Sequence, residues 1–296
     1  MMQVLNGSLV ALVTPMKIGG EIDFDALNKI IDWHIQQGTN GIVSVGTTGE
    51  SATLNFEEHI EVIRHTINYV DGRLPVIAGT GANSTSEALD LTKEAKNIGA
   101  NYALIVTPYY NKPSQKGLIE HYTKIADSVD IPQILYNVPS RTACDLLPST
   151  SEILSEHKNI VGIKEAVCDK DRIKDLIKIS ISNDNFKIYS GDDPSFLNML
   201  SVGGHGVISV AANVVPKYIS DICSFFQNNE VEKAEEINDK LKNLYDLLFI
   251  QSNPIPVKWM MYKMGLIQNA LRLPLVELDR KYQEIIISEM LKLELL

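Results

Sequence analysis

The stretch Asn159-Ile160-Val161-Gly162-Ile163-Lys164-Glu165-Ala166 is a short apolar run with a lysine near its C-terminal end. A run of this length predicts a buried strand. A helix is predicted directly after it, from Asp169 to Ile181. The ammonium of Lys164 either reaches water past the strand end or lies in a pocket, where desolvation lowers its pKa and frees neutral amine. A neutral amine can attack a ketone and form an imine.

The same strand-then-helix unit recurs along the chain. The predicted strands span residues 8–14, 40–46, 74–79, 101–107, 132–137, 159–166, 186–190 and 206–210. Eight units at a spacing of roughly 25–30 residues are typical of a (β/α)8 TIM barrel. A doubly wound sheet is the alternative, but it rarely contains eight regular units, and no GxGxxG motif follows the first strand. The pattern therefore favours the TIM barrel, an α/β fold.

The pattern changes after residue 228, where helices follow one another without strands. These helices are predicted over residues 230–252, 256–264 and 276–293. We therefore predict a catalytic barrel over residues 1–228 and a C-terminal helical region over residues 229–296. The apolar stripes of these helices predict that the region packs against the barrel or against another subunit.

Composition excludes several classes of function. The 296 residues carry a formal net charge of -10, which argues against a nucleic-acid or acidic-membrane surface. The three cysteines form no CxxC motif, and the N-terminus lacks the features of a signal peptide, so we expect a cytoplasmic protein. No apolar stretch approaches transmembrane length. The six histidines form no HExxH motif, so no metal site is predicted.

Polar side chains gather at the predicted C-terminal ends of the strands, where TIM barrels place their active sites. They are Thr47, Thr48, Tyr109, Tyr110, Tyr136, Arg141, Lys164, Asp192, Asp193 and Ser209. A tyrosine on the strand next to the lysine can pass protons while an imine forms, although a core tyrosine is the alternative. A glycine-flanked threonine turn can hold a carboxylate, and so can an arginine fork. The alternatives are a plain turn and a solvated arginine.

Six motifs resemble, in the correct order, the family of 4-hydroxy-tetrahydrodipicolinate synthases, also called dihydrodipicolinate synthases. They are Gly46-Thr-Thr-Gly-Glu-Ser-Ala-Thr-Leu54, Val106-Thr-Pro-Tyr-Tyr-Asn111, Ile134-Leu-Tyr-Asn-Val-Pro-Ser-Arg-Thr142, Gly162-Ile-Lys-Glu-Ala166, Ser190-Gly-Asp-Asp193 and Gly203-Gly-His-Gly-Val-Ile-Ser-Val210. The resemblance runs from about Gly7 to Pro274. N-acetylneuraminate lyase and other pyruvate aldolases share the lysine and the tyrosine, but the paired threonines and Ser140-Arg141 resemble the synthase branch.

The resemblance implies a lyase that condenses pyruvate with L-aspartate 4-semialdehyde in diaminopimelate and lysine biosynthesis, with no cofactor or metal. The implied catalytic residues are Lys164, Tyr136, Thr47 and Tyr110, the last reaching in from a neighbouring subunit. The implied substrate-binding residues are Thr48, Arg141, Gly191 and Ile208. Two alternatives stay open. A retro-aldol lyase would release pyruvate from a keto-deoxy sugar acid, and a catalytically silent barrel would not form an imine.

The resemblance also implies a homotetramer built as a dimer of dimers, and feedback inhibition by L-lysine at the dimer interface. The matching residues are Ser51, Ala52, His59, Asn83, Glu87 and Tyr109. Glu87 can pair with an ammonium group, and Tyr109 and Asn83 can hydrogen-bond a carboxylate. Phe56 departs from the inhibited branch, which has a second histidine there. We therefore expect partial inhibition.

Overall fold

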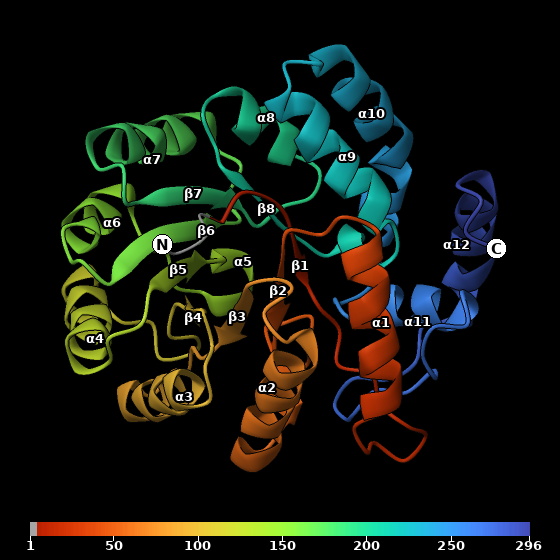
Figure 1. The fold of residues 1–296 in the computed structure, drawn as a ribbon, viewed down its shortest axis with the longest axis horizontal. Coiled ribbons are helices and arrows are strands. Elements are labelled where there is room, and N and C mark those ends of the chain that lie inside the picture. Colours follow the sequence, from red (N-terminus) through yellow and green to blue (C-terminus); the bar gives the residue numbers. More distant parts are fainter. Residues whose placement is uncertain (1–4) are drawn as a thin grey trace.

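The computed structural model describes residues 5–296, and the centre of this part of the chain is a closed barrel of parallel strands in sequence order. The strands are β1 (Gly7–Ala11), β2 (Gly41–Ser44), β3 (Val76–Gly79), β4 (Tyr102–Val106), β5 (Gln133–Asn137), β6 (Ile160–Glu165), β7 (Lys187–Ser190) and β8 (Gly206–Ser209). The ring closes where β1 pairs with β8, with Ser8 opposite Val207. Figure 1 shows the strands surrounded by helices. The prediction of a TIM barrel is confirmed.

Helices cover the outside of the ring and begin where the sequence provides caps. They are α1 (Phe24–Gln36), α2 (Phe56–Val70), α3 (Thr85–Asn97), α4 (Gln115–Ser128), α6 (Pro148–Ser155), α7 (Lys170–Ser182), α8 (Phe196–Ser201) and α9 (Pro216–Gln227). The Asn55 side chain accepts a hydrogen bond from the Glu58 N–H, and Glu58 accepts one from the Asn55 N–H. This capping box satisfies two amides at the start of α2. The Asp169 side chain caps α7 by accepting from the Arg172 N–H.

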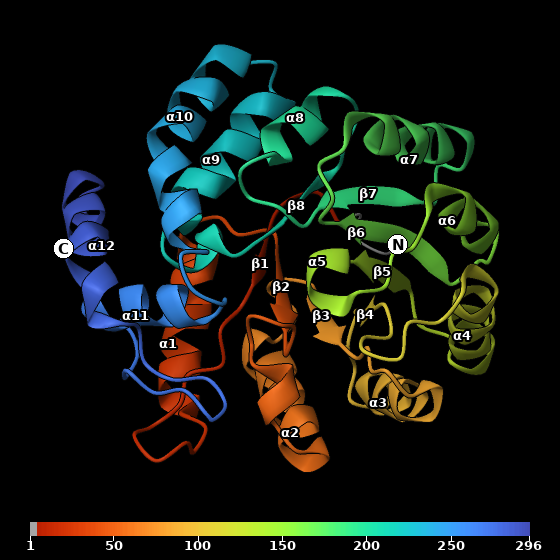
Figure 2. The ribbon, with the colours of Figure 1, turned by 180° about the vertical axis from the view of Figure 1, so that it is seen from behind.

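Three short helical segments were not predicted from the sequence. They are η1 (Ser51–Thr53), α5 (Pro139–Thr142) and η2 (Ala211–Asn213). Each is too short for an apolar period to be visible. A turn also precedes α8, in which Asp192 accepts hydrogen bonds from the N–H and the hydroxyl of Ser195. Figure 2 shows α5, which carries Arg141, beside β5 in the middle of the ring.

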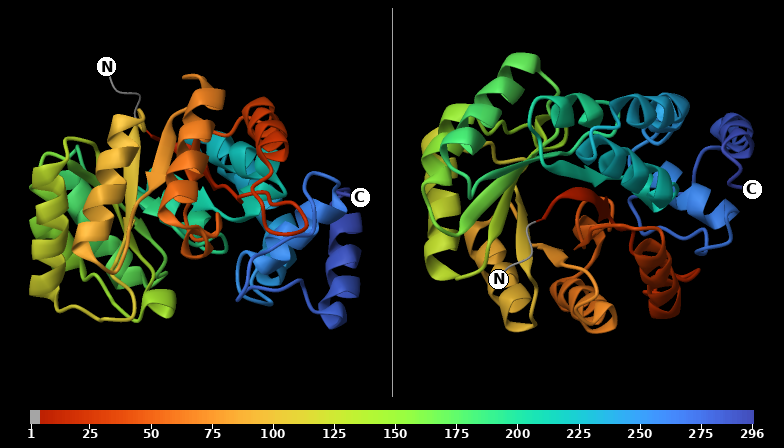
Figure 3. Two further views of the ribbon diagram at one scale, coloured as in Figure 1. Left: turned by 90° about the horizontal axis from the view of Figure 1, so that it is seen from below. Right: turned by 45° about the horizontal axis from the view of Figure 1, so that its top comes forward.

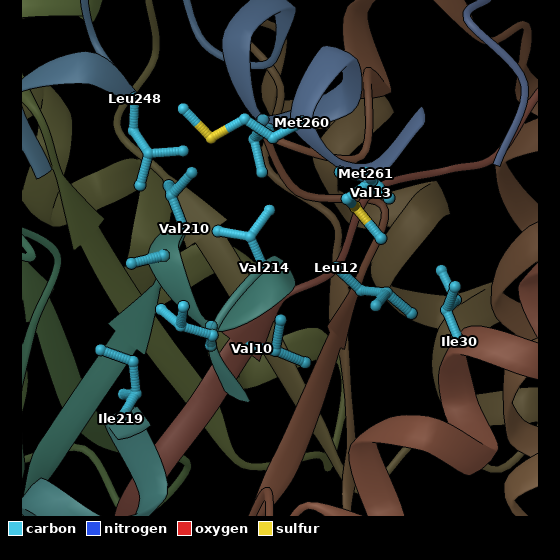
Figure 4. Packing of buried hydrophobic residues seen from close by; sticks show 14 of the residues in the cluster. Val10, Leu12, Val13, Ile30, Val210, Val214, Ile219, Leu248, Met260 and Met261 are labelled. Carbon is cyan, nitrogen blue, oxygen red and sulfur yellow. The ribbon is translucent and has the colours of Figure 1, made fainter. Parts of the chain in front are cut away.

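The C-terminal helices are α10 (Val231–Leu247), α11 (Ile255–Lys263) and α12 (Arg280–Lys292). They lie on the side of the barrel that carries α1 and α9, away from α4 and α6 (Figures 1 and 3). Their buried side chains belong to the same apolar cluster as residues of β1 and α1. In the close-up of Figure 4, Leu248, Met260 and Met261 face Val13 and Val210. The C-terminal helices therefore share a hydrophobic core with the barrel.

No helix within residues 5–296 has both the length and the apolar character needed to cross a membrane. The same residues contain no group of three or more His, Cys, Asp and Glu side chains that could hold a metal ion. Cys144 and Cys223 are buried thiols and Cys168 is an exposed one, and none of the three forms a disulfide.

Candidate active site

A cavity of about 490 Å³ opens at the C-terminal ends of the strands, and we call it the inner cavity. It is lined by Ala11, Val43, Gly46, Thr47, Thr48, Leu104, Tyr136, Val138, Ser140, Arg141, Lys164, Ala166, Gly191, Asp192, Val210, Phe249, Gln251, Ser252 and Asn253. Residues from five of the six motifs thus meet in one space, together with Phe249, Gln251, Ser252 and Asn253 from the C-terminal region. The structure brings Lys164, Tyr136, Thr47, Thr48, Arg141 and Gly191 together as neighbours of one cavity.

Lys164 is at the end of β6 and is only 5% exposed. Burial lowers its pKa from the usual value to about 8; the charge of Asp193 opposes this shift and the charge of Arg141 adds to it. A Cβ atom on Gly191 would lie 3.0 Å from Lys164 Cε, so a side chain at position 191 would displace the lysine. The fold therefore holds a lysine that is partly neutral near neutral pH, which a nucleophilic amine requires.

Tyr136 is opposite Lys164 in the pairing of β5 with β6. The Lys164 ammonium lies over the Tyr136 ring, 4.3 Å from the ring centroid. Burial raises the pKa of Tyr136, while Arg141 and a hydrogen bond with the Thr47 side chain lower it. The phenol is therefore protonated at neutral pH, hydrogen-bonded to Thr47 and close to the lysine, which is the placement that a proton-transfer group needs.

Two groups that can bind carboxylates face the same cavity. Thr48 is buried, and its Oγ1 accepts a hydrogen bond of 2.9 Å from Nδ2 of Asn253. Because Oγ1 accepts this bond, the hydroxyl proton of Thr48 stays available to a ligand. Arg141 lies on α5, and its Nη2 is 3.5 Å from the carbonyl oxygen of Asn253. The cavity that contains the lysine thus offers two donors to carboxylate groups.

Ile208 and Ser209 do not lie among the residues that line the inner cavity. Ile208 is fully buried in β8. The Ser209 side chain accepts a hydrogen bond from the Ala212 N–H and contacts Asp193, so it stabilises the end of β8. Asp193 in turn accepts hydrogen bonds of 3.0 Å from the N–H groups of Val210 and Ala211. The binding role of the Ile208 main chain stays a prediction.

Tyr109 and Tyr110 lie outside the inner cavity. The Tyr110 side chain is 88% exposed, and its backbone has a φ of +74°. A non-glycine residue in the left-handed region is uncommon and costs conformational energy. Within one chain the structure therefore does not bring Tyr110 to Tyr136 and Lys164. Instead the loop after β4 presents the phenol outward.

A second cavity, of about 430 Å³, lies beside the first, and we call it the outer cavity. It is lined by Thr47, Glu50, Ser51, Ala52, Thr53, Leu54, Phe56, His59, Gly81, Ala82, Glu87, Leu91, Val106, Tyr109, Val138, Arg141, Thr142, Asn253, Pro254, Pro274 and Leu275. Five of the six residues predicted for L-lysine are among them. Asn83 is not, and its carbonyl oxygen accepts a hydrogen bond from Asn111. The His59 imidazole donates to the Gly79 carbonyl oxygen at 2.7 Å, so one of its ring nitrogens is already hydrogen-bonded within the chain.

The two cavities share part of their lining. Thr47, Val138, Arg141 and Asn253 contribute to both. Asn253 was missed by the sequence analysis because it lies about ninety residues beyond the lysine in a region of helices. The only local signal was Asn253-Pro-Ile-Pro256, a turn before a helix.

The sequence matches the Dihydrodipicolinate synthetase family over residues 4–292. A 4-hydroxy-tetrahydrodipicolinate synthase of Pseudomonas syringae is 56% identical over 281 residues, which cover 95% of this chain and 96% of the relative. The chloride-inhibited dihydrodipicolinate synthase of Acinetobacter baumannii in complex with pyruvate is 48% identical, with a TM-score of 0.96 and coverage of 99% and 100%. The dihydrodipicolinate synthase of Cyanidioschyzon merolae with lysine bound is 36% identical, with a TM-score of 0.95 and coverage of 98% and 99%. This chain therefore belongs to the dihydrodipicolinate synthetase family.

Proposed function

We propose that this chain condenses pyruvate with L-aspartate 4-semialdehyde to give 4-hydroxy-tetrahydrodipicolinate, the first committed step toward diaminopimelate and lysine. The observation that carries the proposal is the buried Lys164, whose pKa is lowered by burial to about 8. It lines a cavity together with Tyr136 and two groups that can bind carboxylates, Thr48 and Arg141. The Pseudomonas relative is named for this activity, and the Acinetobacter relative is described in complex with pyruvate.

In the first half-reaction, neutral Lys164 Nζ attacks the ketone carbon of pyruvate, whose carboxylate binds the Thr48 hydroxyl. The carbonyl oxygen takes a proton from Tyr136, and the carbinolamine then loses water to leave a protonated imine. Thr47, hydrogen-bonded to Tyr136, returns a proton to the phenol. The imine is an electron sink, so the former methyl group of pyruvate gives up a proton and an enamine forms.

In the second half-reaction, the enamine carbon attacks the aldehyde carbon of the semialdehyde, and the new alkoxide takes a proton from the relay. Arg141 holds the carboxylate of this second substrate through its guanidinium fork. The substrate's own amine then attacks the imine carbon and displaces Lys164. A six-membered ring closes and the lysine returns as a free amine. The main chain of Gly191 and Ile208 lines the pocket for pyruvate.

The proton relay is completed by Tyr110 from a second copy of the chain. Support comes from the 88% exposure of Tyr110 and from its left-handed backbone, which together aim a tyrosine out of its own subunit. A tyrosine with this exposure and this strain is expected where the strain serves an interface. The assembly we propose is a homotetramer, a dimer of dimers, in which the Tyr110 loops cross the tighter interface.

L-Lysine is the ligand we propose for the outer cavity. Glu87 there can pair with an ammonium group, and the Tyr109 hydroxyl can donate to a carboxylate. Burial and the charge of Glu87 raise the pKa of Tyr109, which keeps the phenol protonated as a donor. The Cyanidioschyzon relative is described with lysine bound. Because Thr47 and Arg141 border both cavities, ligand in one can change binding in the other.

The compartment we propose is the cytoplasm, since the three cysteines are unpaired thiols, which a reducing compartment preserves. We also propose residues 1–228 as the catalytic barrel and residues 229–296 as a helical region that is continuous with its core. That continuity is supported by the apolar cluster that contains residues of both parts.

The experiment that tests the function is reduction of the pyruvate imine. Purified protein is incubated with pyruvate and sodium borohydride, and the modified peptide is identified by mass spectrometry. We expect one modification, on Lys164, followed by loss of synthase activity in a coupled assay with the semialdehyde. No label on Lys164 would overturn the proposal. Pyruvate released from a keto-deoxy sugar acid, with no condensation of the semialdehyde, would select the retro-aldol alternative.

A further inference from the structure

The turn that carries Thr47 and Thr48 is strained at both ends. Val45 precedes the turn with a φ of +56°, and Glu50 ends it with a φ of +57°. Neither residue is glycine, and for a β-branched valine this conformation is a genuine outlier. Strained residues of this kind persist only where their surroundings over-determine them, and they gather at functional sites. Contacts from distant parts of the chain hold this turn in its strained conformation.

One of these contacts is a buried ion pair. Lys258 of α11 and Glu50 both have side chains with no exposure to solvent, and Lys258 Nζ is 2.5 Å from Glu50 Oε1. The same ammonium donates to the Thr14 carbonyl oxygen at 3.1 Å, and the Arg272 N–H donates to the second oxygen of Glu50 at 3.3 Å. Two bonds from distant parts of the chain thus hold Glu50, the last residue of the turn, and a third anchors Lys258 to Thr14.

The other contact fixes a hydroxyl group. The Asn253 amide nitrogen donates to Thr48 Oγ1 at 2.9 Å. An amide N–H can only donate, so the Thr48 oxygen is the acceptor and its own proton is directed to another partner. Asn253 is 5% exposed and lines both cavities. Its Oδ1 has no hydrogen-bond partner within residues 5–296, so the side chain is held by the bond to Thr48 and not by a wider network.

Lys164 and Lys258 are the buried lysines among residues 5–296, and their contacts differ. Burial lowers the pKa of both, but the charge of Glu50 opposes the shift at Lys258 through direct contact. Lys164 makes no ion pair within the described residues, as a nucleophile requires. Lys258 is instead charged, paired and outside the cavities, which suits a support for the backbone.

We propose that Asn253 and Lys258, both from the C-terminal helical region, are positioning residues for the threonine turn. Lys258 holds the strained backbone through Glu50, and Asn253 sets the direction in which the Thr48 hydroxyl donates. Together they align Thr48 with the carboxylate of pyruvate. This inference rests on the proposed role of Thr48 in pyruvate binding. It gives the C-terminal region a part in catalysis although it supplies no reacting group.

The first test replaces both members of the ion pair, in the double variant Lys258→Met/Glu50→Met. Removal of one partner would leave a buried unpaired charge, whereas removal of both leaves a neutral pair of similar volume, which costs less stability. We expect the KM for pyruvate to rise about tenfold, the cost of one misdirected hydrogen bond to a charged group, with a smaller change in kcat. Lys240→Met, which breaks an exposed pair on α10, is the control and leaves KM unchanged.

The second test keeps the size of the side chain and reverses one hydrogen bond. In Asn253→Asp a carboxylate can only accept, so it takes the Thr48 proton that pyruvate needs. We expect its KM for pyruvate to rise by more than that of Asn253→Ala, in which the hydroxyl is free to rotate. A merely structural Asn253 predicts the opposite order, because the isosteric variant fills the same space and the alanine variant does not.

The readouts are KM and kcat, the rate of borohydride trapping with pyruvate, and the thermal midpoint of each variant. A pyruvate KM equal to that of the wild type in both Lys258→Met/Glu50→Met and Asn253→Asp overturns the inference. If the double variant does not fold, Asn253→Asp alone decides. Wild-type protein that is not labelled on Lys164 would overturn the proposed function. Wild-type labelling together with unaffected variants would overturn only this inference.

Discussion

The inner and the outer cavity share four residues but differ in how complete they are within one chain. The reactive groups of the inner cavity are buried, with Lys164 at 5% and Tyr136 at 7% exposure. In the outer cavity Tyr109 is 39% and Phe56 is 42% exposed. Tyr110, on the same loop as Tyr109, is almost fully exposed. The groups proposed for imine chemistry are thus enclosed by one chain, whereas the groups proposed for proton exchange and regulation lie on an exposed surface, as expected if a second copy covers it.

The largest effect expected from this comparison is at the centre of the inner cavity. Lys164→Ala removes the amine proposed to form the imine, so we expect turnover to fall by several orders of magnitude, on the order of a thousandfold or more. The variant should stay folded, because the replaced ammonium is buried and makes no ion pair within residues 5–296. Steady-state rates with a circular dichroism spectrum check both points. Near-normal turnover of the pure variant would mean that the inner cavity does not perform the chemistry.

A smaller but still large effect is expected at the exposed loop. Tyr110→Phe keeps the ring and removes the hydroxyl, so we expect a loss of about a hundredfold, the usual contribution of one proton-transfer group. The measurement is kcat with saturating pyruvate and semialdehyde. Ile181→Ala is the control, since Ile181 is an exposed apolar residue on α7 that neither cavity includes. Full activity of Tyr110→Phe would show that the inner cavity needs no group from the loop.

Mixed dimers test whether Tyr110 acts in the inner cavity of the other copy. A dimer of one Tyr110→Phe chain and one Lys164→Ala chain has one site with both an intact lysine and an intact tyrosine from the other copy. Random exchange of equal amounts should therefore recover about a quarter of wild-type activity, since half of the dimers are mixed and each has one working site of two. Absence of recovery after proven subunit exchange would place Tyr110 within its own chain or outside the reaction.

The pH dependence sharpens the account of the inner cavity. Below the Lys164 pKa of about 8, the neutral amine falls about tenfold per pH unit, so kcat/KM for pyruvate should rise from pH 6 and level off above about 8. Asp193→Asn removes a charge that raises this pKa, so the rise should move to lower pH. The same shift acts on stability. Between pH 8 and 10.5 the folded chain binds fewer protons than the unfolded chain, because the pKa of Lys164 is lower in the folded state. Burial of the charged lysine therefore destabilises the folded state below pH 8, and this loss of stability is relieved as pH rises from 8 to 10.5. A flat profile between pH 6 and 9 would contradict the assignment of Lys164.

Much of the inner cavity could be predicted from sequence because strand ends are local features. A buried apolar run indicates where a strand ends, and in a TIM barrel the C-terminal ends of all strands lie at the same face of the barrel. Lys164, Tyr136 and the threonine turn each end or follow such a run, so their meeting followed from the topology. The motifs added the roles, which spacing alone left open between catalytic and structural interpretations.

The rest could not be predicted because it depends on contacts between distant segments. Asn253 reaches Thr48 across 205 positions, and Lys258 reaches Glu50 across 208. Hydrophobic periodicity is a local feature of the sequence and does not indicate such long-range pairs. The strain at Val45 and the left-handed backbone of Tyr110 are also invisible in sequence, since neither residue type favours that conformation. The short helix that carries Arg141 has four residues, fewer than an apolar period needs to be recognised.

The smallest expected effect concerns the ligand of the outer cavity. Phe56 lines this cavity and is partly exposed, so it offers L-lysine an apolar ring where a histidine would offer a hydrogen-bonding nitrogen. We expect the wild type to be inhibited only partially by L-lysine, and Phe56→His to raise its affinity by about tenfold, the gain from one hydrogen bond in a half-exposed position. Titration calorimetry and initial rates with added L-lysine measure both quantities. Ile181→His, which adds the same side chain far from either cavity, should leave them unchanged. Unchanged rates and no binding heat at tens of millimolar L-lysine, in wild type and in Phe56→His, would restrict the outer cavity to a role in subunit contact. The inner cavity would then not be regulated by L-lysine through the residues that it shares with the outer cavity.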